Sequence, residues 1–447
     1  MNDTIVAIST ALGEGAISII RVSGDDAIKI INPLFEGKDL EKASSHTINY
    51  GHIVYNGEII DEVLLSIMKA PKTYTKEDVI EINTHGSIAV VNKIMEILLF
   101  EGCRLAEPGE FTKRAFLNGR IDLTESEGVM DLINSETELT RKMAINELSG
   151  NVSRLITDTR EDIISLISNI EVNIDYPEYE DIEVVTINKI REKVREIKEK
   201  LLKTLKLSED GKILKDGIKT VILGKPNVGK SSLLNALLEE EKAIVTDVKG
   251  TTRDIVEGSI LVGGVKLNLI DTAGVRKSDD IVEKIGIEKS LNLIDEAELV
   301  LLILDASCPL SEEDKYLLEK TKDKKRIIIM NKIDLNLNNS YMDDVIKISA
   351  KNNEGIEDIK DVIKKLFNVG TFMSKNLTFF TNVRQISLLK SAIKSLEDVE
   401  QGIKEEREID MIEIDLKLVW EKLGDIIGAN YTEELIDNLF SRFCLGK

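Results

Sequence analysis

The stretch that decides the fold is GKPNVGKS, residues 224–231. It fits the P-loop pattern G-x-x-x-x-G-K-[ST]. An apolar run at 220–223 precedes it and predicts a buried strand, and a helical pattern at 232–238 follows it. Because strand, glycine-rich turn and helix form the context that this motif needs, the sequence predicts an α/β domain that binds phosphates.

Four residues of the loop have a chemical role in this prediction. Gly224 and Gly229 let backbone N–H groups approach the phosphates, and the start of the following helix adds the positive end of its dipole. Lys230 is expected to reach the β- and γ-phosphates, and Ser231 to ligate Mg²⁺. The loop therefore predicts a nucleotide triphosphate with its metal.

Two further segments extend the predicted phosphate and metal site. The sequence DTAG, residues 271–274, follows a strand pattern at 265–270, so Asp271 can hold Mg²⁺ through water and Gly274 can donate its N–H to the γ-phosphate. Between this segment and the P-loop lies GTTRD, residues 250–254, the expected switch loop. Its Thr252 can complete the Mg²⁺ coordination when the γ-phosphate is present.

The base is selected by the last two segments. The sequence NKID, residues 331–334, follows a strand pattern at 326–330, and its Asp334 carboxylate can accept hydrogen bonds from guanine N1–H and the exocyclic amine. Adenine offers no such pair of donors and would leave a carboxylate unpaired, which is costly. The sequence SAK, residues 349–351, follows another strand at 345–348 and is expected to touch the guanine carbonyl. Together the segments predict a GTPase.

One position departs from the common small-GTPase pattern. Val275 follows Gly274, where a Gln often orients the attacking water. Arg253 and Arg276 are candidate catalytic arginines, and both are equally consistent with solvated loop charges. From the residues alone, Asn227 is a turn residue after a proline and Glu283 is an acid on a helix surface.

Composition sets broad limits. The chain has 447 residues, 59 Lys and Arg against 80 Asp and Glu, and a net charge of −21, so it repels nucleic acid on average and any RNA contact needs a local basic patch or a basic partner. Three scattered cysteines favour a reducing compartment. No signal sequence and no apolar run of about 20 residues is found, which predicts a cytoplasmic protein without a membrane span.

Periodicity predicts a multidomain chain. Residues 1–118 have the short strands and single long helix of an α+β domain, and 217–374 alternate strands with helices. Residues 119–216 and 375–447 carry apolar residues at helical spacing, and an acidic break lies at 175–181. The simplest packing joins both helical blocks into one all-α bundle with an α/β P-loop GTPase domain inserted. Separate small bundles are the alternative.

The order of these parts resembles the bacterial tRNA modification GTPase family called MnmE or TrmE. The resemblance extends over the chain and includes IRVSG at 20–24, YTKEDV at 74–79 and GKPNVGKSS at 224–232. Its most specific parts are EFTKRAFLNGRIDL at 110–123 and the ending CLGK at 444–447. The nucleotide motifs alone identify only a GTPase.

The resemblance implies a folate site in the first domain. Family members have an N-terminal domain similar to folate-binding proteins, form homodimers through it and bind 5-formyltetrahydrofolate there, with methylene-tetrahydrofolate as an alternative one-carbon donor. The matching folate contacts are Arg21, Glu81, Arg120 and Lys447. Other members can carry Lys where this chain has Arg120, so there only the positive charge is transferred.

The resemblance also implies a reaction. With an FAD-containing partner protein, in a heterotetramer, the family adds a carboxymethylaminomethyl group to carbon 5 of the wobble uridine of certain tRNAs. We expect the partner to hold most of the tRNA. Dimerisation of the GTPase domains with bound K⁺ drives hydrolysis. The sequence does not indicate which tRNAs are modified, or whether glycine or ammonia supplies nitrogen.

Residue roles in hydrolysis follow from the same resemblance. The K⁺ ligand matches Asn227, helped by the loop residues Thr246, Val248 and Thr251, and the water-orienting acid matches Glu283. The expected catalytic set is Glu283, Lys230 and Thr252, and Mg²⁺ is expected at Ser231, Thr252 and Asp271. The full predicted GTP-binding set is Asn227, Val228, Gly229, Lys230, Ser231, Ser232, Thr246, Asp247, Val248, Lys249, Gly250, Thr251, Thr252, Asp271, Thr272, Ala273, Gly274, Asn331, Lys332, Asp334, Ser349, Ala350 and Lys351.

Two other functions remain open at this point. A ribosome-assembly GTPase often carries a basic RNA-binding module or a second nucleotide domain, whereas this chain has one P-loop and an acidic helical tail without a GXXG loop. A nucleotide-dependent switch would use GTP to choose partners with slow turnover. Hydrolysis in K⁺ compared with Na⁺ distinguishes the switch from the enzyme.

Overall fold

The computed structural model describes residues 3–175, 187–240, 258–270, 293–335, 344–373, 377–443 and 446. The chain forms two compact units. One consists of residues 1–130, 153–187 and 395–447, and the other of residues 131–152 and 188–394. In the described ranges, no helix is long and apolar enough to cross a membrane.

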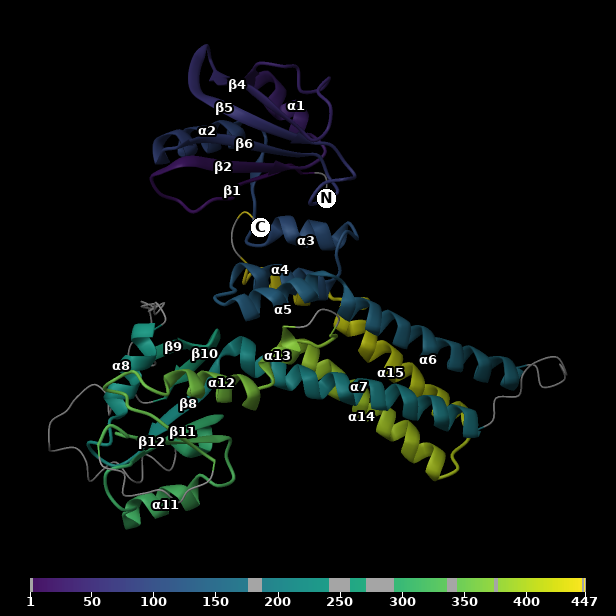
Figure 1. Cartoon of the computed structure of the whole chain (residues 1–447). Helices are drawn as coiled ribbons and strands as arrows, with labels where there is room; N and C mark the ends of the chain where they lie inside the picture. Colours follow the sequence, from purple (N-terminus) through teal and green to yellow (C-terminus); the bar gives the residue numbers. More distant parts are fainter. Residues whose placement is uncertain are drawn as a thin grey trace. The chain divides into compact units, whose positions relative to one another are not determined.

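The first unit contains a seven-stranded sheet (Figure 1). All its strand pairs are antiparallel except β1 with β7. In the register of β2 with β6, Arg21 lies directly opposite Glu81. In spatial order the strands are β3 (Phe35–Glu36), β4 (Thr47–Tyr55), β5 (Glu58–Met68), β6 (Val79–Gly86), β2 (Gly15–Ser23), β1 (Ile5–Ile8) and β7 (Arg104–Leu105).

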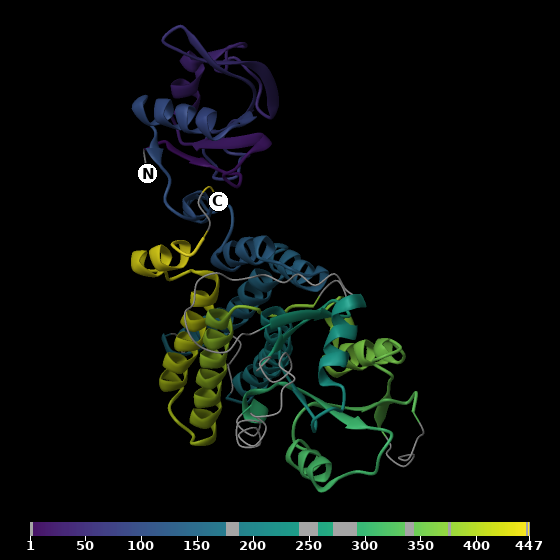
Figure 2. The same ribbon diagram turned by 90° about the vertical axis from the view of Figure 1, so that its left-hand side faces the viewer.

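One face of this sheet is covered by helix α2 (Ile88–Phe100). The other is exposed at Tyr50 and Leu64 but covered at β1, where Ile5 and Ala7 pack against Phe111. Helix α2 lies along the covered face (Figure 2). Its Ile94 and Leu98 join a core with Ile20 and Ile82. Side chains alternate across a strand, so residues such as Arg21 and Glu81 belong to the other face. The short helices α1 (Ala27–Ile31) and η1 (Asn32–Leu34) also contribute to the core.

The rest of the first unit is helical. It comprises α3 (Glu110–Leu117), most of α4 (Leu123–Ile133), α6 (Asn151–Asp175), the end of α14 (Val383–Lys404), α15 (Ile409–Ile427) and α16 (Glu433–Phe440). Phe440 and Phe443, at the end of the chain, pack against Phe116 and Leu123 in one apolar cluster. Lys417 pairs with Glu171 at 2.9 Å, which joins α15 to α6. The last helices therefore pack on elements that are far away in sequence.

The second unit is built around a six-stranded sheet that is parallel except for the β9–β10 pair. Strand β11 is a continuous buried apolar run because helices cover both faces of the sheet. Those helices are α8 (Lys230–Glu240), α11 (Glu312–Lys320), α12 (Ile356–Leu366) and α13 (Val369–Phe372). The spatial order of the strands is β13 (Val345–Lys347), β12 (Arg326–Asn331), β11 (Leu299–Asp305), β8 (Ile218–Leu223), β10 (Val265–Leu269) and β9 (Gly258–Val262).

Helical segments on both sides of this α/β domain in sequence meet in the same unit. Asn146 of α5 (Glu138–Leu148) donates to the carbonyl of Leu377 at 2.6 Å. Ser208 of α7 (Ile187–Asp216) accepts from the backbone N–H of Phe380 at 2.8 Å. The α/β domain is thus an insertion between helical segments that contact each other.

The predicted fold class is confirmed: an α+β N-terminal domain, helical segments and an inserted α/β domain. The strands expected near 4–8, 16–22, 220–223, 265–270, 326–330 and 345–348 are present as β1, β2, β8, β10, β12 and β13. The predicted boundaries at 118, 216 and 374 stay predictions. Apart from Asp175, the acidic break at 175–181 lies outside the described residues.

Candidate functional site

The P-loop is the turn between β8 and α8, at the carboxyl edge of the parallel sheet. Gly229 has φ +100°, and a Cβ there would lie 2.2 Å from Nδ2 of Asn331. No larger residue fits this position, because the loop and the NKID segment approach so closely. Asn227 is exposed at the tip of the loop with φ +60°, a conformation in which Asn is common.

The lysine of the motif, Lys230, bonds its own loop. Lys230 Nζ donates to the carbonyl oxygens of Gly224 at 2.6 Å and Lys225 at 3.1 Å. The ammonium group thus lies beside the backbone that is expected to surround the phosphates. Ser231 and Ser232 occupy the exposed first turn of α8, where the N-terminal end of the helix dipole favours an anion.

Asn331 connects three of the predicted segments. Its Nδ2 donates to the carbonyl of Val228 in the P-loop at 2.8 Å, and its Oδ1 accepts from the N–H of Ala350 in the SAK segment at 3.0 Å. The side chain is only 3% exposed, so both bonds are shielded from water. The phosphate loop and the base-recognition segments are therefore held together by one buried amide.

The Asp334 carboxylate, which is expected to bind guanine, is held in place by a hydrogen bond. Ser349 Oγ donates to Asp334 Oδ1 at 2.7 Å. The N–H of Ile333 donates to the carbonyl of Ile348 at 3.2 Å, which joins the two backbones. These contacts place Asp334 beside the loop of Ala350 and Lys351, as the base-recognition prediction requires.

Asp305 was not identified from the sequence. It lies at the end of β11 and pairs with Lys332 at 2.7 Å. Burial opposes its ionisation, but hydrogen bonds from Lys332 and Ser307 hold the pKa of Asp305 below its ordinary value. The sequence does contain a signal for Asp305, because this acid ends an otherwise apolar strand. That strand pairs with β8, which leads into the P-loop.

The remaining expected nucleotide residues lie outside the described residues. These are Thr246, Asp247, Val248, Lys249, Gly250, Thr251, Thr252, Asp271, Thr272, Ala273, Gly274 and Glu283, together with Arg253, Val275 and Arg276. Their predicted roles in Mg²⁺ binding, K⁺ binding and water activation stay predictions.

A second polar site lies on the open face of the first sheet. Arg21 Nε donates to Glu81 Oε1 at 2.9 Å, and Arg21 Nη1 donates to the carbonyl of Gly446 at 3.1 Å. The two side chains are 16% and 24% exposed. The guanidinium is therefore largely occupied by protein groups. Of the expected folate contacts, Lys447 lies outside the described residues.

Tyr74 joins the other expected contacts. Its ring centroid lies 5.8 Å from the guanidinium carbon of Arg21 and 4.7 Å from that of Arg120, a geometry suited to cation–π attraction. Its hydroxyl is hydrogen-bonded to Thr112 of α3 at 2.9 Å. The structure thus brings Arg21, Glu81 and Arg120 around one aromatic ring. Tyr74 begins the distinctive 74–79 segment, but sequence reasoning gave it no role.

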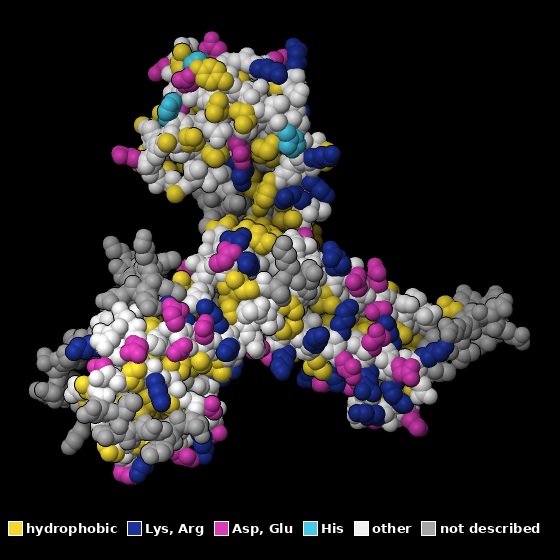
Figure 3. Space-filling model, in the orientation of Figure 1, with side chains coloured by type: hydrophobic (Ala, Val, Ile, Leu, Met, Phe, Trp, Pro, Cys, Tyr) yellow, Lys and Arg dark blue, Asp and Glu magenta, His cyan; other side chains and the backbone are white. Residues whose placement is uncertain are grey.

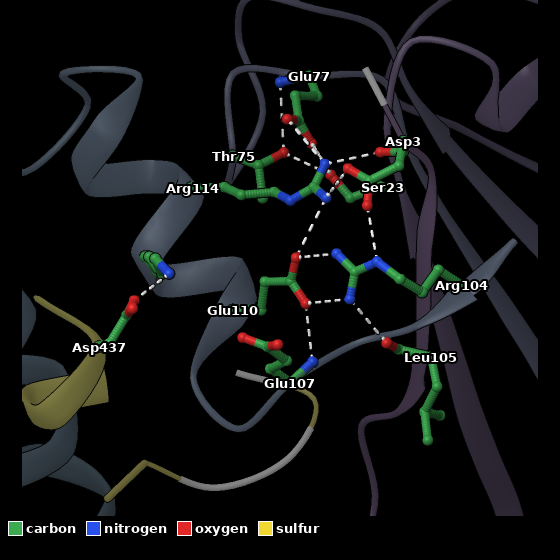
Figure 4. A network of polar contacts seen from close by, with 11 residues as sticks. Asp3, Ser23, Thr75, Glu77, Arg104, Leu105, Glu107, Glu110, Arg114 and Asp437 are labelled. Atoms are coloured by element: carbon green, nitrogen blue, oxygen red, sulfur yellow. Dashed lines mark hydrogen bonds and ion pairs between the residues drawn. The ribbon is translucent and has the colours of Figure 1, made fainter. Parts of the chain in front are cut away.

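An ionic network around the buried Arg114, drawn in Figure 4, contacts the segment that carries Tyr74. Arg114 of α3, 1% exposed, donates to Asp3 Oδ1 at 2.7 Å and Glu77 Oε1 at 3.1 Å. Ser23 donates to Glu77 Oε2 at 2.8 Å. Glu77 is three residues from Tyr74, so the network fixes the segment bearing the ring against both β2 and α3.

Glu110 neutralises the same network from α3. It accepts from Arg104 Nη1 at 3.0 Å, from Arg114 Nη2 at 3.2 Å and from the N–H of Glu107 at 2.7 Å. Burial opposes ionisation, but these hydrogen bonds and the charges of both arginines lower the pKa of Glu110 below its ordinary value. Buried charges compensated in this way hold α3 in one position.

Two family models match the chain. The "GTP-binding protein TrmE N-terminus" model matches residues 4–120, which contain the Arg21–Glu81 site. The "MnmE helical domain" model matches residues 123–444, which contain the P-loop domain.

Curated relatives match over the whole chain. A protein of Streptococcus thermophilus named "tRNA modification GTPase MnmE" is 54% identical over 450 residues, covering 100% of this chain and 98% of the relative. A protein of Streptococcus mutans with the same name is 51% identical, covering 100% and 99%.

Solved structures match only in part. The FeoB G-domain of Methanococcus jannaschii is 24% identical over 34% of this chain and 98% of that chain, with a TM-score of 0.24. A likeness at this level does not bear on the function.

Proposed function

Since this chain belongs to the MnmE family of tRNA modification GTPases, we propose that its two sites serve one process, GTP hydrolysis coupled to tRNA modification. The P-loop domain is the hydrolase. The modification is the addition of a carboxymethylaminomethyl group to carbon 5 of the wobble uridine of certain tRNAs. It is carried out with an FAD-containing partner protein and 5-formyltetrahydrofolate bound to the N-terminal domain.

The buried Asn331 side chain is the observation that best supports GTP as substrate. It joins the phosphate loop at Val228 to the base-recognition loop at Ala350. A nucleotide that bridges both loops therefore meets a prearranged surface, with little conformational entropy to lose. The Asp334 carboxylate is held by a hydrogen bond from Ser349. It favours guanine because N1–H and the exocyclic amine of that base can both donate to it.

Mg²⁺ and K⁺ are proposed at this site. Ser231 offers a hydroxyl in the first turn of α8 for Mg²⁺, to be joined by Thr252 and Asp271. Asn227, exposed at the loop tip, offers a side-chain oxygen for K⁺, with the backbone at Thr246, Val248 and Thr251. When bound, both cations supply positive charge that stabilises the developing phosphate charge. In this proposal Lys230 turns from its loop carbonyls to the phosphates, and Glu283 orients the attacking water.

The folate proposal rests on the convergence of Arg21, Glu81 and Arg120 around Tyr74. The Glu81 carboxylate can accept hydrogen bonds from the N–H donors of a pterin, just as Asp334 can accept them from guanine. An aromatic ring offers stacking area, and an exposed guanidinium offers a counter-charge for the ligand's glutamate. Lys447 would complete the set beside Gly446.

A homodimer through the N-terminal domain is supported by the open face of its sheet. Tyr50 lies opposite Leu64, Leu64 opposite Asn83, and Asn83 opposite Ile19, so the four share this face in a continuous row. Tyr50 is 63% exposed and Leu64 46%. Figure 3 shows hydrophobic side chains among charged ones on this domain. Exposed side chains with large apolar area, such as Tyr50 and Leu64 in this row, favour a protein contact.

The partner is proposed to hold most of the tRNA. A chain with net charge −21 repels phosphate, and its lysines are largely interspersed with acids. The FAD-containing protein and this homodimer would form a heterotetramer. The free thiols of Cys103 and Cys308 are consistent with a reducing cytoplasmic location.

One experiment tests the modification. A strain lacking this chain should lose the carboxymethylaminomethyl group from its wobble uridines, as measured by mass spectrometry of digested tRNA. A normal nucleoside profile accompanied by defective ribosomal RNA processing would favour a ribosome-assembly GTPase instead.

A second experiment tests the hydrolysis. GTP turnover of the purified chain should be faster in K⁺ than in Na⁺, and Asn227→Ala should remove the difference. Equal rates in both salts would point to Arg253 or Arg276, and a lack of turnover in either would favour a nucleotide switch.

A further inference from the structure

The loop that carries Tyr74 also presents a cation in an unusual conformation. Lys76 has φ +61°, in the left-handed region that a non-glycine residue rarely adopts. Its Nζ donates to the carbonyl of Gly119 at 2.9 Å. A strained lysine held by this contact places its charge beside the residue that precedes Arg120. Strain of this kind is often associated with function.

Lys76 and Arg120 form a pair of accessible cations. Both side chains belong to exposed residues. In the part of the chain that the structure describes, neither makes an ion pair. Their contacts are a carbonyl for Lys76 and the ring of Tyr74 for Arg120, so both charges stay available to an anion.

The carboxylates of the same loop are engaged elsewhere. Asp122 Oδ1 accepts from the N–H of Glu125 at 2.9 Å and from Thr124 Oγ1 at 2.7 Å. Glu125 Oε2 accepts from the N–H of Asp122 at 2.9 Å. These bonds hold both carboxylates at the beginning of α4. Burial raises the pKa of Glu125, and the attraction of the Arg120 charge opposes that rise only in part. Neither acid forms an ion pair with Arg120 among the described residues.

Arg21 is the other guanidinium near the Tyr74 ring, and it is already engaged. Its Nε bonds Glu81 and its Nη1 bonds the Gly446 carbonyl. The groups around Tyr74 thus include a half-buried carboxylate, Glu81, for hydrogen-bond donors and two exposed cations, Lys76 and Arg120. A ligand matching this polarity has a donor-rich head, an aromatic middle and several carboxylates at its tail.

We propose that Lys76 and Arg120 bind the successive γ-linked glutamates of a folate tail, so that this chain prefers polyglutamylated to monoglutamylated folate. The inference rests on the proposed folate site and assigns to Lys76 a role in tail recognition. Arg120 pairs with the first carboxylates, and Lys76 with those added beyond them. A single exposed ion pair contributes little to binding. We therefore expect polyglutamylated folate to bind roughly fivefold more tightly than monoglutamylated folate, with a ratio that depends on salt.

The test compares 5-formyltetrahydrofolate carrying one glutamate with the same molecule carrying three. Titration calorimetry on the full-length protein at about 20 mM salt should give roughly fivefold tighter binding of the triglutamate, and about 200 mM salt should reduce that ratio. Equal affinity for the two ligands at low salt would overturn the inference and leave the folate site standing. Absence of binding by both would overturn the folate site with it.

Two substitutions at one position separate charge from structure. Lys76→Gly removes the charge and suits the left-handed backbone, so it should abolish the preference while leaving monoglutamate affinity unchanged. Lys76→Arg should retain the preference. The control Lys93→Gln removes an exposed lysine of α2 that is paired with Glu96, and should change neither affinity. A Lys76→Gly protein that still prefers the triglutamate would overturn the role of Lys76.

Discussion

Ser9 donates a hydrogen bond of 3.2 Å to the carbonyl oxygen of Gly446, a residue 437 positions further along the chain. The same oxygen accepts from Arg21 Nη1, so the end of the chain is part of the polar site on the first sheet. Gly446 is buried there. Chain ends are usually poorly ordered unless they are tied down in this way.

The Asn331 bridge should be essential for nucleotide affinity. In Asn331→Ala, the Val228 carbonyl and the Ala350 N–H lose their buried partner, at a cost of about 1–3 kcal/mol for each group left unsatisfied. We expect GTP and GDP affinity to fall by at least roughly tenfold in a fluorescent-nucleotide titration.

A matched control is Asn188→Ala, which removes an exposed Asn from α7 and its bond to Arg191. It should bind GTP normally. An Asn331→Ala protein with wild-type affinity would show that the loops assemble without the bridge.

Asp334→Asn should change base preference. Asp334 is expected to accept from guanine N1–H and the exocyclic amine, and xanthine replaces that amine with a carbonyl that an Asn amide can meet. Loss of a charge-assisted pair costs about 1.5–3 kcal/mol, so GTP affinity should fall by roughly tenfold or more while XTP affinity rises. Competition between GTP and XTP measures both. Unchanged GTP affinity would remove Asp334 from the base site.

The two described cysteines should differ in reactivity. Burial raises the pKa of the Cys103 thiol to about 12, and the residue is 6% exposed, whereas Cys308 is half-buried. At pH 8 a maleimide should label Cys308 and leave Cys103 unlabelled until urea is added, as peptide mass spectrometry can show. Rapid labelling of native Cys103 would contradict its buried position.

The same pKa shift predicts alkaline destabilisation. The pKa of Cys103 is higher in the folded chain than its ordinary value of 9, so the unfolded thiol loses its proton first. Its contribution to the free energy of unfolding is complete below pH 9 and falls between about pH 9 and 12, by at most about 1.4 kcal/mol per pH unit. Cys103→Ala should flatten that part of a urea-denaturation series, and an unchanged slope would count against the shift.

Sequence reasoning was most successful where a local pattern carries the information. The P-loop, its preceding strand and its following helix lie within about 20 consecutive residues, and the apolar runs ending at Leu223 and Met330 predict β8 and β12 directly. The resemblance named Arg21, Glu81 and Arg120, and the structure brings these together, although their role as folate contacts stays a proposal.

Polar contacts between residues far apart in the sequence could not be predicted from local sequence patterns. Arg114 bonds Asp3 and Glu77, which are 111 and 37 residues away, and nothing in the periodicity of α3 indicates those partners. Tyr74 likewise lies near Arg21 and Arg120, and its hydroxyl is hydrogen-bonded to Thr112, 38 residues away in the sequence. Lys76 becomes notable only through its backbone angle, which no sequence pattern reveals.

The end of the chain gives the last prediction. Gly446 has φ +86°, and a Cβ there would lie 2.5 Å from the carbonyl oxygen of Ile8, so Gly446→Ala should displace the tail from Ser9 and Arg21. Folate binding and tRNA modification should then be strongly reduced, whereas K⁺-stimulated GTP hydrolysis should persist, because the P-loop domain belongs to the other compact unit. Deletion of residues 444–447 should have the same effect.

Gly57→Ala is a suitable control, since Gly57 has φ +82° but open space around it and lies in the β4–β5 turn. The Gly57→Ala substitution introduces a similar backbone strain without a steric clash, so it should leave tRNA modification intact. Normal modification in the Gly446→Ala protein would mean that the buried tail is not needed for the folate-dependent step. Loss of hydrolysis as well would mean that the tail serves the stability of the whole chain.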